Sequence, residues 1–564
     1  MAPDRRANPP LAGTLRRDER LVSVGLGVAM ALAAALLLYL GRGTTYSIDE
    51  LPWLIESPEL SLGEAFKPHN GHLILTSRLL YKGVLEVFGS DYLAFRLLAT
   101  ACVLLTSGLV FVYAKRRVGA WAALAPCLVL LVFGSDIVHV LVGNGITVLL
   151  AICCGVGALI ALDREDRAGD VAACLLLCLG VVTYSVAVAF AVGIGVARLA
   201  GPDRWRRIWV PALPLALYGC WWLWSLGEPS GSEGQLVYSN VLLIPAWAFQ
   251  SISAALGALS GLDFRFAGSA EGDRPAGTVL ALAGITALLW RYRRSVPAPL
   301  LGAIAIALTL FAIEAVAHTP LFSSPFSPRY LYPAAAVVIV VAAEAARDVR
   351  WTRGGLAILL AAAAVGAATN IAQLRNNARS LRDDYAPILR AELAGLELAG
   401  DRTVADFDPH TPLDGQNNLV IPFAEAVVLR DSPAASYLRA VEDYGKVGFT
   451  AEELVGRDDS VSARADAVLA AALGISLKPA VRLGACRQLG SASPAGTSFP
   501  LPPAGVVIQS ARAAPVSIGR FAPPSVEVGI LARGQPAVLA APPDSAPGRW
   551  LVSVPAAPLR VCGL

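Results

Sequence analysis

The chain has 564 residues, of which 55% are hydrophobic and only 16% are charged. So few charges on so long a chain, together with long apolar runs, exclude an ordinary water-soluble protein and indicate a polytopic α-helical membrane protein. The formal net charge of +3 is too small to indicate a nucleic-acid partner.

The N-terminal 40 residues predict a cytoplasmic tail and a first membrane span. Residues 1–20 are polar and rich in arginine and proline, and we expect them to be disordered. The apolar run over residues 21–40 is long enough to cross a bilayer. Because no convincing cleavage site follows it, the run predicts a retained signal anchor. Arg16, Arg17 and Arg20 place the N-terminus in the cytoplasm, since cytoplasmic loops are enriched in basic residues.

The apolar runs and the basic loops between them predict about eleven spans. The second span is expected at residues 92–113, the third begins at about residue 121, and the fourth ends before the charged loop 163–170. Residues 171–199 predict two short spans with an outer tip at residues 183–185. The remaining spans are expected at residues 208–226, 278–290, 300–317, 330–346 and 356–371. Residues 241–262 are expected to be interfacial or re-entrant. If these residues crossed the membrane, Arg291, Arg293 and Arg294 would lie outside the cell, although basic residues are enriched in cytoplasmic loops.

The composition changes from residue 372, which predicts an extracytoplasmic domain over residues 372–564. An amphipathic helix is expected to leave the membrane first. Short β-prone runs separated by proline and glycine then predict a β-rich fold from about residue 400. Cys486 and Cys562 bracket this region and can form a disulfide in an oxidising exterior, although two unpaired thiols are the alternative.

Polar residues are concentrated in the stretch over residues 46–72, directly after the first span. It contains Asp49, Glu50, Lys67, His69 and His72. A carboxylate held against an apolar wall can act as a general base, or it can bind a divalent metal such as Mg²⁺ or Mn²⁺. The lysine and the histidines can donate to a phosphate, and the two histidines share a face if the stretch is helical. Helix capping and plain solvation are the structural alternatives.

Further polar residues are expected at outer loops far along the chain. Asp136 and His139 lie on the second outer loop, where a buried charge is costly unless it faces a cavity. Arg329, followed by Tyr330, is the strongest fixed positive charge for a phosphate on the outer face, with an ordinary interfacial arginine as the alternative. Tyr184, at the predicted tip, can line the same cavity.

These features resemble the GT-C fold of glycosyltransferases that use polyprenyl-phosphate sugars, nearest in pattern to protein O-mannosyltransferases and lipid A aminoarabinose transferases. In those families an Asp-Glu pair opens the first outer loop, and a KPP-like element and an Arg-containing element follow. The corresponding residues here are Asp49-Glu50, Lys67-Pro68-His69, and Phe88-Gly89 with Arg96. Asp136 matches a second acidic residue, and Arg329-Tyr330 matches an Arg-Tyr element before a late span. The sequence KPHNGH departs from KPP.

The resemblance implies a membrane glycosyltransferase in the cell membrane, with its C-terminus outside. It would move a sugar from a polyprenyl-phosphate donor to a glycan, lipid or protein acceptor with inversion. Asp49 would act as general base, Glu50 as a supporting or capping acid, and Asp136 would position the acceptor or a metal. The donor phosphate would contact Lys67, His69, His72, Arg329 and Tyr330.

Two other classes of function remain open at this point. A transporter or flippase of lipid-linked saccharides would also need charged groups within the membrane, but no repeat of the kind common in transporters stands out. A non-catalytic scaffold of an envelope complex is the other alternative. One polar cleft that joins Asp49, Asp136 and Arg329 would favour the enzyme.

Overall fold

The computed structural model describes residues 11–47, 49–202, 205–228, 237–262, 275–317, 324–405, 407, 434–480, 484–489, 496–544, 546–555 and 558–563. The chain divides into two compact units. The first comprises Met1–Arg42, Leu60–Tyr81 and Leu93–Arg379, and the second comprises Gly43–Glu59, Lys82–Tyr92 and Ser380–Leu564. The predicted boundary at residue 372 is therefore close to Ser380, where the last segment of the second unit begins, but two earlier segments also belong to that unit.

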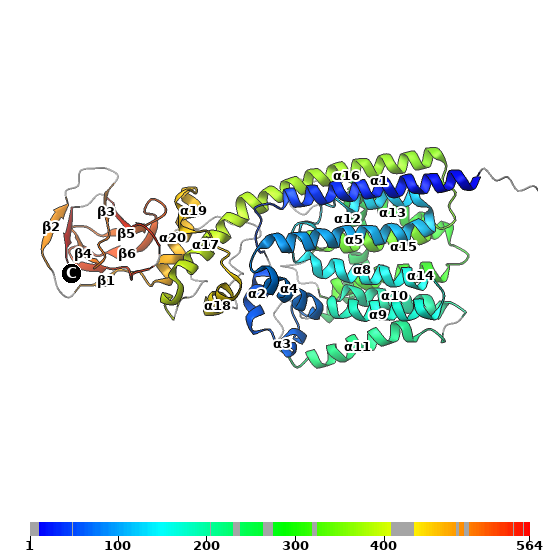
Figure 1. Ribbon diagram of the computed structural model, residues 1–564, viewed down its shortest axis with the longest axis horizontal. Helices are drawn as coiled ribbons and strands as arrows, with labels where there is room; N and C mark the ends of the chain where they lie inside the picture. Colours follow the sequence, from blue (N-terminus) through cyan, green and yellow to red (C-terminus); the bar gives the residue numbers. More distant parts are fainter. Residues whose placement is uncertain are drawn as a thin grey trace, which may run out of the picture. The chain divides into compact units, whose positions relative to one another are not determined.

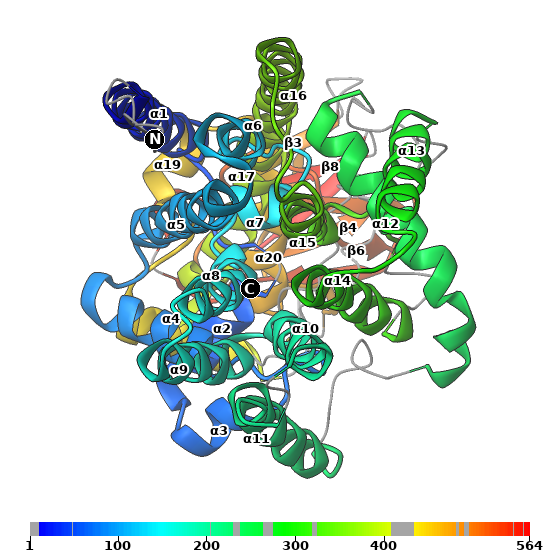
Figure 2. The ribbon, with the colours of Figure 1, turned by 90° about the vertical axis from the view of Figure 1, so that its right-hand side faces the viewer.

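The first unit is a bundle of helices (Figure 1). Its elements are α1 (Leu11–Leu40), α3 (Leu62–Phe66), α5 (Tyr92–Val118), α6 (Ala120–Leu130), α7 (Ile137–Val140), α8 (Gly145–Leu162), α9 (Arg167–Thr183), α10 (Val186–Ala200), α11 (Trp209–Ser225), η3 (Tyr238–Leu243), α12 (Ile244–Ser260), α13 (Pro275–Arg291), α14 (Ala298–Val316), α15 (Pro328–Ala345) and α16 (Arg353–Arg379). Helix α4 (Leu75–Phe88) begins in this unit and ends in the second. Figure 2 shows α8, α9, α10 and α14 end-on and side by side.

Helices are expected here because a helix satisfies all its backbone hydrogen bonds internally, as an apolar environment demands. Seven helical segments of the described residues are long and apolar enough to cross a membrane: Glu19–Leu40, Tyr92–Val118, Gly145–Leu162, Tyr238–Ser260, Ala298–Val316, Pro328–Ala345 and Arg353–Arg402. The predicted helical membrane architecture is confirmed, whereas the number eleven stays a prediction. The helix break expected at residues 183–185 lies between α9 and α10.

The start of the chain differs from the prediction. Helix α1 begins at Leu11, so the tail expected over residues 1–20 is helical in its second half. Residues 1–10 lie outside the described part. The last proline of the tail is Pro10, and nothing after it in the tail interrupts a helix.

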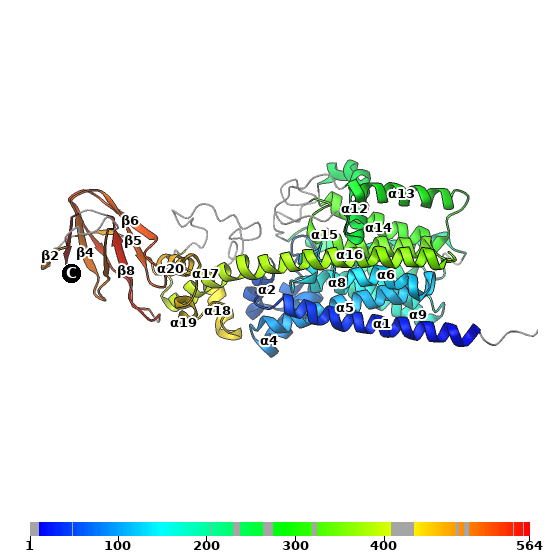
Figure 3. The same cartoon turned by 90° about the horizontal axis from the view of Figure 1, so that it is seen from above.

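Helix α12 corresponds to the segment that we expected to be interfacial or re-entrant. Near its start, Trp247 donates a hydrogen bond to Glu314 in the last turn of α14, at 3.3 Å. Near its end, the carbonyl of Ala258 accepts a hydrogen bond from Asn370, which also binds Ser135. Both ends of α12 therefore contact one end of the bundle, and α12 runs across the other helices (Figures 2 and 3). By length and composition alone, it also qualifies as a span.

Charged residues join the helices at the end of the bundle opposite the one that α12 contacts. Arg117, at the end of α5, pairs with Asp163 after α8 at 3.1 Å and with Glu344 near the end of α15. Tyr113 donates a second hydrogen bond to Glu344 at 2.7 Å. The side chains of Arg117 and Glu344 are only 5% and 3% exposed, so each requires its partner.

The other basic loops gather at this same end. Arg207, before α11, pairs at 3.1 Å with Asp170 in the first turn of α9, which closely follows Asp163 in sequence. Arg291, at the end of α13, donates to the carbonyl of Arg347 after α15. Clusters that sequence analysis assigned to separate cytoplasmic loops therefore form one charged end, which we call the basic end.

The second unit contains short helices and two β-sheets. Its helical elements are α2 (Glu50–Glu56), η1 (Ser57–Glu59), the π-helix η4 (Ser380–Tyr385), α17 (Ala386–Ala399), η5 (Gly400–Arg402), α18 (Ala434–Tyr444), α19 (Ala451–Val455) and α20 (Asp459–Ala472). Helices α17 and α20 pack closely, since a Cβ on Gly395 would lie 2.6 Å from the carbonyl oxygen of Ala465.

In the described part of the chain, the β-strands begin later than predicted. The first of them starts at Lys478, not at about residue 400, and helices α18, α19 and α20 lie before it between Ala434 and Ala472. The sequence of α20, DSVSARADAVLAAA, is rich in alanine, the strongest helix former. The β-prone runs that led to the prediction all lie further along the chain.

Nine strands among the described residues form the two sheets (Figure 3). They are β1 (Lys478–Pro479), β2 (Cys486–Leu489), β3 (Thr497–Pro500), β4 (Val506–Ser510), β5 (Ala514–Gly519), β6 (Val526–Leu531), β7 (Pro536–Leu539), β8 (Leu551–Val554) and β9 (Leu559–Cys562). One sheet has the order β1-β7-β4-β9-β2 and the other β3-β8-β5-β6, and the paired strands are antiparallel. Val507, Ile508, Val516, Ile518 and Val552 are fully buried in the core.

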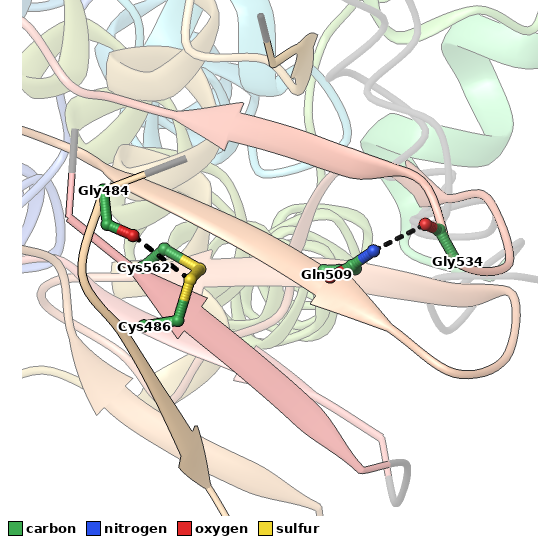
Figure 4. Close-up of a disulfide and its surroundings, with 5 residues drawn as sticks. All are labelled: Gly484, Cys486, Gln509, Gly534 and Cys562. Atoms are coloured by element: carbon green, nitrogen blue, oxygen red, sulfur yellow. Dashed lines mark hydrogen bonds between the residues drawn. A yellow bond between two sulfur atoms is a disulfide. The ribbon is translucent and has the colours of Figure 1, made fainter. Parts of the chain in front are cut away.

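The predicted disulfide between Cys486 and Cys562 is confirmed (Figure 4). The two cysteines lie directly opposite each other in the β2–β9 pair. The bond therefore ties the edge strand β2 to the last strand across a sequence separation of 76 residues.

Replacing Cys486 and Cys562 by serine should destabilise the β-sheet region. Loss of a cross-link that closes a loop of this length raises the entropy of the unfolded chain and lowers the free energy of unfolding by about 4 kcal/mol. Limited proteolysis of the full-length protein should then cut the C-terminal region faster than in the wild type. The matched control is Cys220→Ser, which removes an exposed free thiol and should leave the cleavage rate unchanged. Equal resistance of the double variant would refute the structural role.

Glu344→Gln should destabilise the helix bundle. The change removes the charge that balances buried Arg117, and breaking a buried pair in this way costs about 3 kcal/mol. The midpoint of thermal unfolding in detergent should fall clearly. Arg164→Ala, whose side chain is 62% exposed beside Asp166, should leave the midpoint unchanged. Equal effects of the two variants would contradict the assignment of a structural clamp.

Candidate active site

Most of the predicted site residues in the first unit lie at the end of the bundle opposite the basic end. Helices α5, α8 and α15 meet at Arg117, Asp163 and Glu344 where they end. Their opposite ends therefore carry the segment that contains Asp136 and the start of α15 that contains Arg329. Helix α9 begins beside the basic end, so the turn between α9 and α10 lies at this far end as well. We call it the polar end.

A two-residue hairpin presents His69 and His72. These residues exchange backbone hydrogen bonds of 3.0 and 2.9 Å, and Asn70 and Gly71 between them have φ angles of 49° and 76°. Two positive φ angles in a two-residue loop define a type I′ turn, for which Asn-Gly is the preferred sequence. The two histidines therefore lie opposite each other in a hairpin, and the helix on which a shared face was conditional is not formed.

The hairpin packs on the turn between α9 and α10. The Nδ1 atom of His72 lies 2.9 Å from the hydroxyl of Ser185, and its ring lies 4.5 Å from that of Tyr184. Ser77, just after the hairpin, donates to the carbonyl of Thr183. Tyr184 therefore contacts the hairpin, and its predicted place in a shared cavity stays a prediction. Ser185 was not recognised from the sequence.

Lys67 lies next to the hairpin and carries a counter-ion. Its ammonium group is 2.8 Å from Glu64, and this hydrogen bond raises the pKa of Lys67 above its ordinary value. Both side chains are about half exposed, so a phosphate can displace the glutamate. Buried Arg78 donates to the carbonyls of Glu64 and Lys67 and fixes the backbone before the hairpin. Arg78 was missed in the sequence, although an arginine within the apolar α4 helix is a recognisable signal.

Asp136 is completely buried and caps the short helix α7. Its Oδ1 atom accepts from the backbone N–H of His139 at 3.0 Å, and its Oδ2 atom accepts from the backbone N–H of Tyr332 at 2.9 Å. Oδ2 also lies 2.7 Å from Nδ1 of His139. Asp136 therefore joins the second outer segment to the start of α15, 196 residues later.

The contacts of Asp136 do not fit the predicted role in metal binding. A carboxylate has about four acceptor positions, and three of those of Asp136 are already used within the protein. Within the described part of the chain, no group of three or more His, Cys, Asp or Glu side chains is arranged to hold a metal ion.

Arg329 and Tyr330 lie in the first turn of α15. The guanidinium carbon of Arg329 lies 5.3 Å from the centre of the Tyr330 ring, which in turn contacts Trp247 edge-on at 6.1 Å. Trp247 donates to Glu314, a carboxylate that is only 7% exposed. An arginine, two aromatic rings and a carboxylate from α12, α14 and α15 thus meet at the polar end.

Asp49 and Glu50 belong to the second unit and differ sharply from each other. Glu50 is fully buried and accepts from the backbone N–H and hydroxyl of Ser47 and from Tyr92 at 2.9 Å. Asp49 is partly exposed and precedes α2, but its side chain does not cap that helix. These contacts support a structural role for Glu50 and leave the role of Asp49 as general base a prediction.

Tyr46, at the start of the polar stretch, and Arg96, of the predicted motif, both have structural contacts. Burial, followed by the charges of Glu50 and Asp91, raises the pKa of Tyr46 far above its ordinary value, so its ring is a neutral part of the core. Arg96 donates to the carbonyl of Gly41 at 2.5 Å and thereby joins the end of α1 to the start of α5. Its place in the motif is explained by packing.

Comparison with known proteins found similar solved structures, of which two crystal structures are described below, and no sequence match. No protein-family model matches the chain, and neither does any curated protein. ArnT from Cupriavidus metallidurans in the apo state is 14% identical, with a TM-score of 0.45 over 67% of this chain and 81% of ArnT. ArnT from the same organism bound to undecaprenyl phosphate is 15% identical, with a TM-score of 0.45 over 76% of this chain and 90% of ArnT.

Proposed function

We propose that the protein is a GT-C-type membrane glycosyltransferase that transfers a sugar from a polyprenyl-phosphate donor. The acceptor is an envelope glycan, lipid or protein on the extracytoplasmic face of the cell membrane. This proposal rests on the pattern of polar residues in the sequence and on their arrangement at the polar end.

The observation that carries the proposal is the difference between the two ends of the bundle. At the basic end, arginines pair with carboxylates and serve packing. At the polar end lie the histidine hairpin, the buried Asp136–His139 pair and Arg329, which come from segments far apart in sequence and each have local polar or aromatic contacts. Polar groups held at the end of an apolar bundle are typical of a site that binds a lipid-linked polar substrate.

In the proposed reaction, Asp49 takes the proton from the acceptor hydroxyl while that oxygen attacks the anomeric carbon. The bond between the anomeric carbon and the phosphate oxygen breaks, and its electron pair leaves with the polyprenyl phosphate. Attack opposite the leaving group inverts the anomeric centre. Lys67, His69, His72, Arg329 and Tyr330 stabilise the charge that develops on the phosphate.

The proposed orientation follows from charge and redox chemistry. Basic loops prefer the cytoplasm, which assigns the basic end and the N-terminus to that side. A structural disulfide is typical of an oxidising compartment, which assigns the β-sheet region to the exterior. Sugar transfer at the polar end then takes place on the extracytoplasmic face.

Deletion of the gene is the direct test of function in the cell. The envelope glycans and lipids of the deletion strain should lack one sugar, and the corresponding polyprenyl-phosphate sugar should accumulate. An unchanged envelope together with lipid-linked saccharide trapped on the cytoplasmic face would instead indicate a flippase.

Asp49→Asn should lower the rate of transfer by at least a hundredfold, because the amide cannot accept the proton from the attacking hydroxyl. Binding of undecaprenyl phosphate to the purified variant should match the wild type. The control is Glu56→Gln, which removes an exposed carboxylate at the end of α2, the helix that follows Asp49, and should leave the rate unchanged. Full activity of the Asp49 variant would exclude its role as general base.

Arg329→Gln should weaken the binding of undecaprenyl phosphate by about tenfold or more, as expected for the loss of a hydrogen bond to a charged group. Titration calorimetry in detergent or nanodiscs measures this directly. Arg293→Gln, an exposed arginine after α13, is the control and should bind as the wild type does. Equal affinity of the two variants would remove Arg329 from the phosphate site.

A further inference from the structure

The second outer segment was predicted to act through Asp136, but its contacts point to the neighbouring histidine. Both oxygens of Asp136 accept backbone N–H groups, one from His139 and one from Tyr332. Both carboxylate oxygens of Asp136 therefore serve as hydrogen-bond acceptors.

This carboxylate determines which nitrogen of His139 carries the proton. Oδ2 of Asp136 lies 2.7 Å from Nδ1 of His139 and can only accept, so Nδ1 must donate. In a neutral imidazole the other nitrogen, Nε2, then has its lone pair available. The carboxylate orients the ring and fixes its tautomer, as in other carboxylate–histidine pairs.

The backbone of His139 is held as firmly as its ring. A Cβ on Gly145, at the start of α8, would lie 2.4 Å from the carbonyl oxygen of His139 and 2.5 Å from its Cα. Only glycine allows so close an approach. His139 is thus fixed at its N–H, at its Nδ1 and along its backbone, whereas within the described residues nothing hydrogen-bonds to its Nε2.

We infer that His139 is the residue of this segment that contacts the substrate, and that Nε2 accepts a hydrogen bond from a hydroxyl group of the acceptor. Asp136 is a positioning residue that acts through His139. This inference rests on the proposed function and specifies which atom holds the acceptor. The side chain of His139 is only 6% exposed, so few water molecules can reach Nε2, and a hydroxyl group of the acceptor can donate a hydrogen bond to it.

The chemistry of the pair favours a hydroxyl over a phosphate. A phosphate oxygen needs a donor, whereas Nε2 of the neutral tautomer offers only a lone pair. The anionic carboxylate directly behind the ring also repels a second anion. The donor phosphate is instead assigned to the hairpin and to Arg329, where the groups are cations or N–H donors.

Two substitutions of His139 distinguish the role of Nδ1 from the role of Nε2. Asparagine places an N–H near the position of Nδ1 and can keep the contact with Asp136, but it has no atom at the position of Nε2. Glutamine places an oxygen near Nε2 and can accept from the hydroxyl. His139→Asn should raise the KM for the acceptor about tenfold, with an unchanged Kd for undecaprenyl phosphate, and His139→Gln should recover part of the loss.

The assay uses undecaprenyl-phosphate sugar as donor and the envelope glycan fraction of the deletion strain as acceptor. If the wild type transfers no sugar, the proposed function fails. If the wild type is active and His139→Asn keeps the acceptor KM of the wild type, the inference fails. It also fails if the Kd for undecaprenyl phosphate rises as much as the KM for the acceptor, since His139 would then contact the donor.

Chemical modification of the wild type tests the same atom without any variant. Diethyl pyrocarbonate acylates an imidazole nitrogen that has a free lone pair, and peptide mass spectrometry locates the product. His139 should be modified, and the envelope glycan fraction should protect it whereas undecaprenyl phosphate should not. Absence of modification, or protection by undecaprenyl phosphate alone, would overturn the assignment of Nε2 to the acceptor.

Discussion

The structure depends on the high free energy of a charge in an apolar environment. A helix bundle that is mostly apolar cannot bury an arginine or a carboxylate unless each has a partner. Arg117 meets this condition at one end by binding Asp163 and Glu344 from two other helices. Asp136 meets it at the other end by binding two backbone N–H groups and the ring of His139. The helices are thus fixed at both ends by the pairing of buried charges.

Buried charges are paired at both ends of the bundle, but the pairing has different consequences at each end. At the basic end every contact joins one protein group to another, which suits a structural clamp. At the polar end, the pairing of Asp136 aligns an imidazole whose second nitrogen has no partner among the described residues. The hairpin likewise fixes His72 through Ser185 and holds the two histidines opposite each other. Rigid positioning of this kind is required of groups that bind a reacting substrate, because small displacements weaken catalysis strongly.

Sequence reasoning was most successful where one physical effect dominates. Long apolar runs predicted the helical bundle, and the break at residues 183–185 was visible because a run of that length is too long for one span. The pairing of Cys486 with Cys562 followed from their isolation from the other cysteines and from the expected compartment. In each case, local composition carries the information.

Sequence reasoning was weaker where contacts join distant segments. The hydrogen bond between Tyr332 and Asp136 joins residues 196 positions apart, and the sequence around neither residue predicts it. His69 and His72 were expected to share a face only if their stretch was helical, and spacing alone cannot distinguish a helix from the Asn-Gly hairpin that forms. Among the described residues the strands start later than expected, because the alanine-rich segment before Lys478 forms a helix. Ser185 was missed because its role depends on a partner that only the fold supplies. The position of Arg78 within an apolar helix is a signal in the sequence, but its backbone partners depend on the fold.

The central claim is that the protein transfers a sugar from a polyprenyl-phosphate donor. The most direct measurement incubates the purified wild type with undecaprenyl phosphate linked to radiolabelled hexoses or pentoses and with the envelope glycan fraction of the deletion strain. The account predicts that label enters the glycan fraction and that undecaprenyl phosphate is released in equal amount. Donor that is only bound, or only moved across a vesicle membrane with its sugar intact, would contradict it.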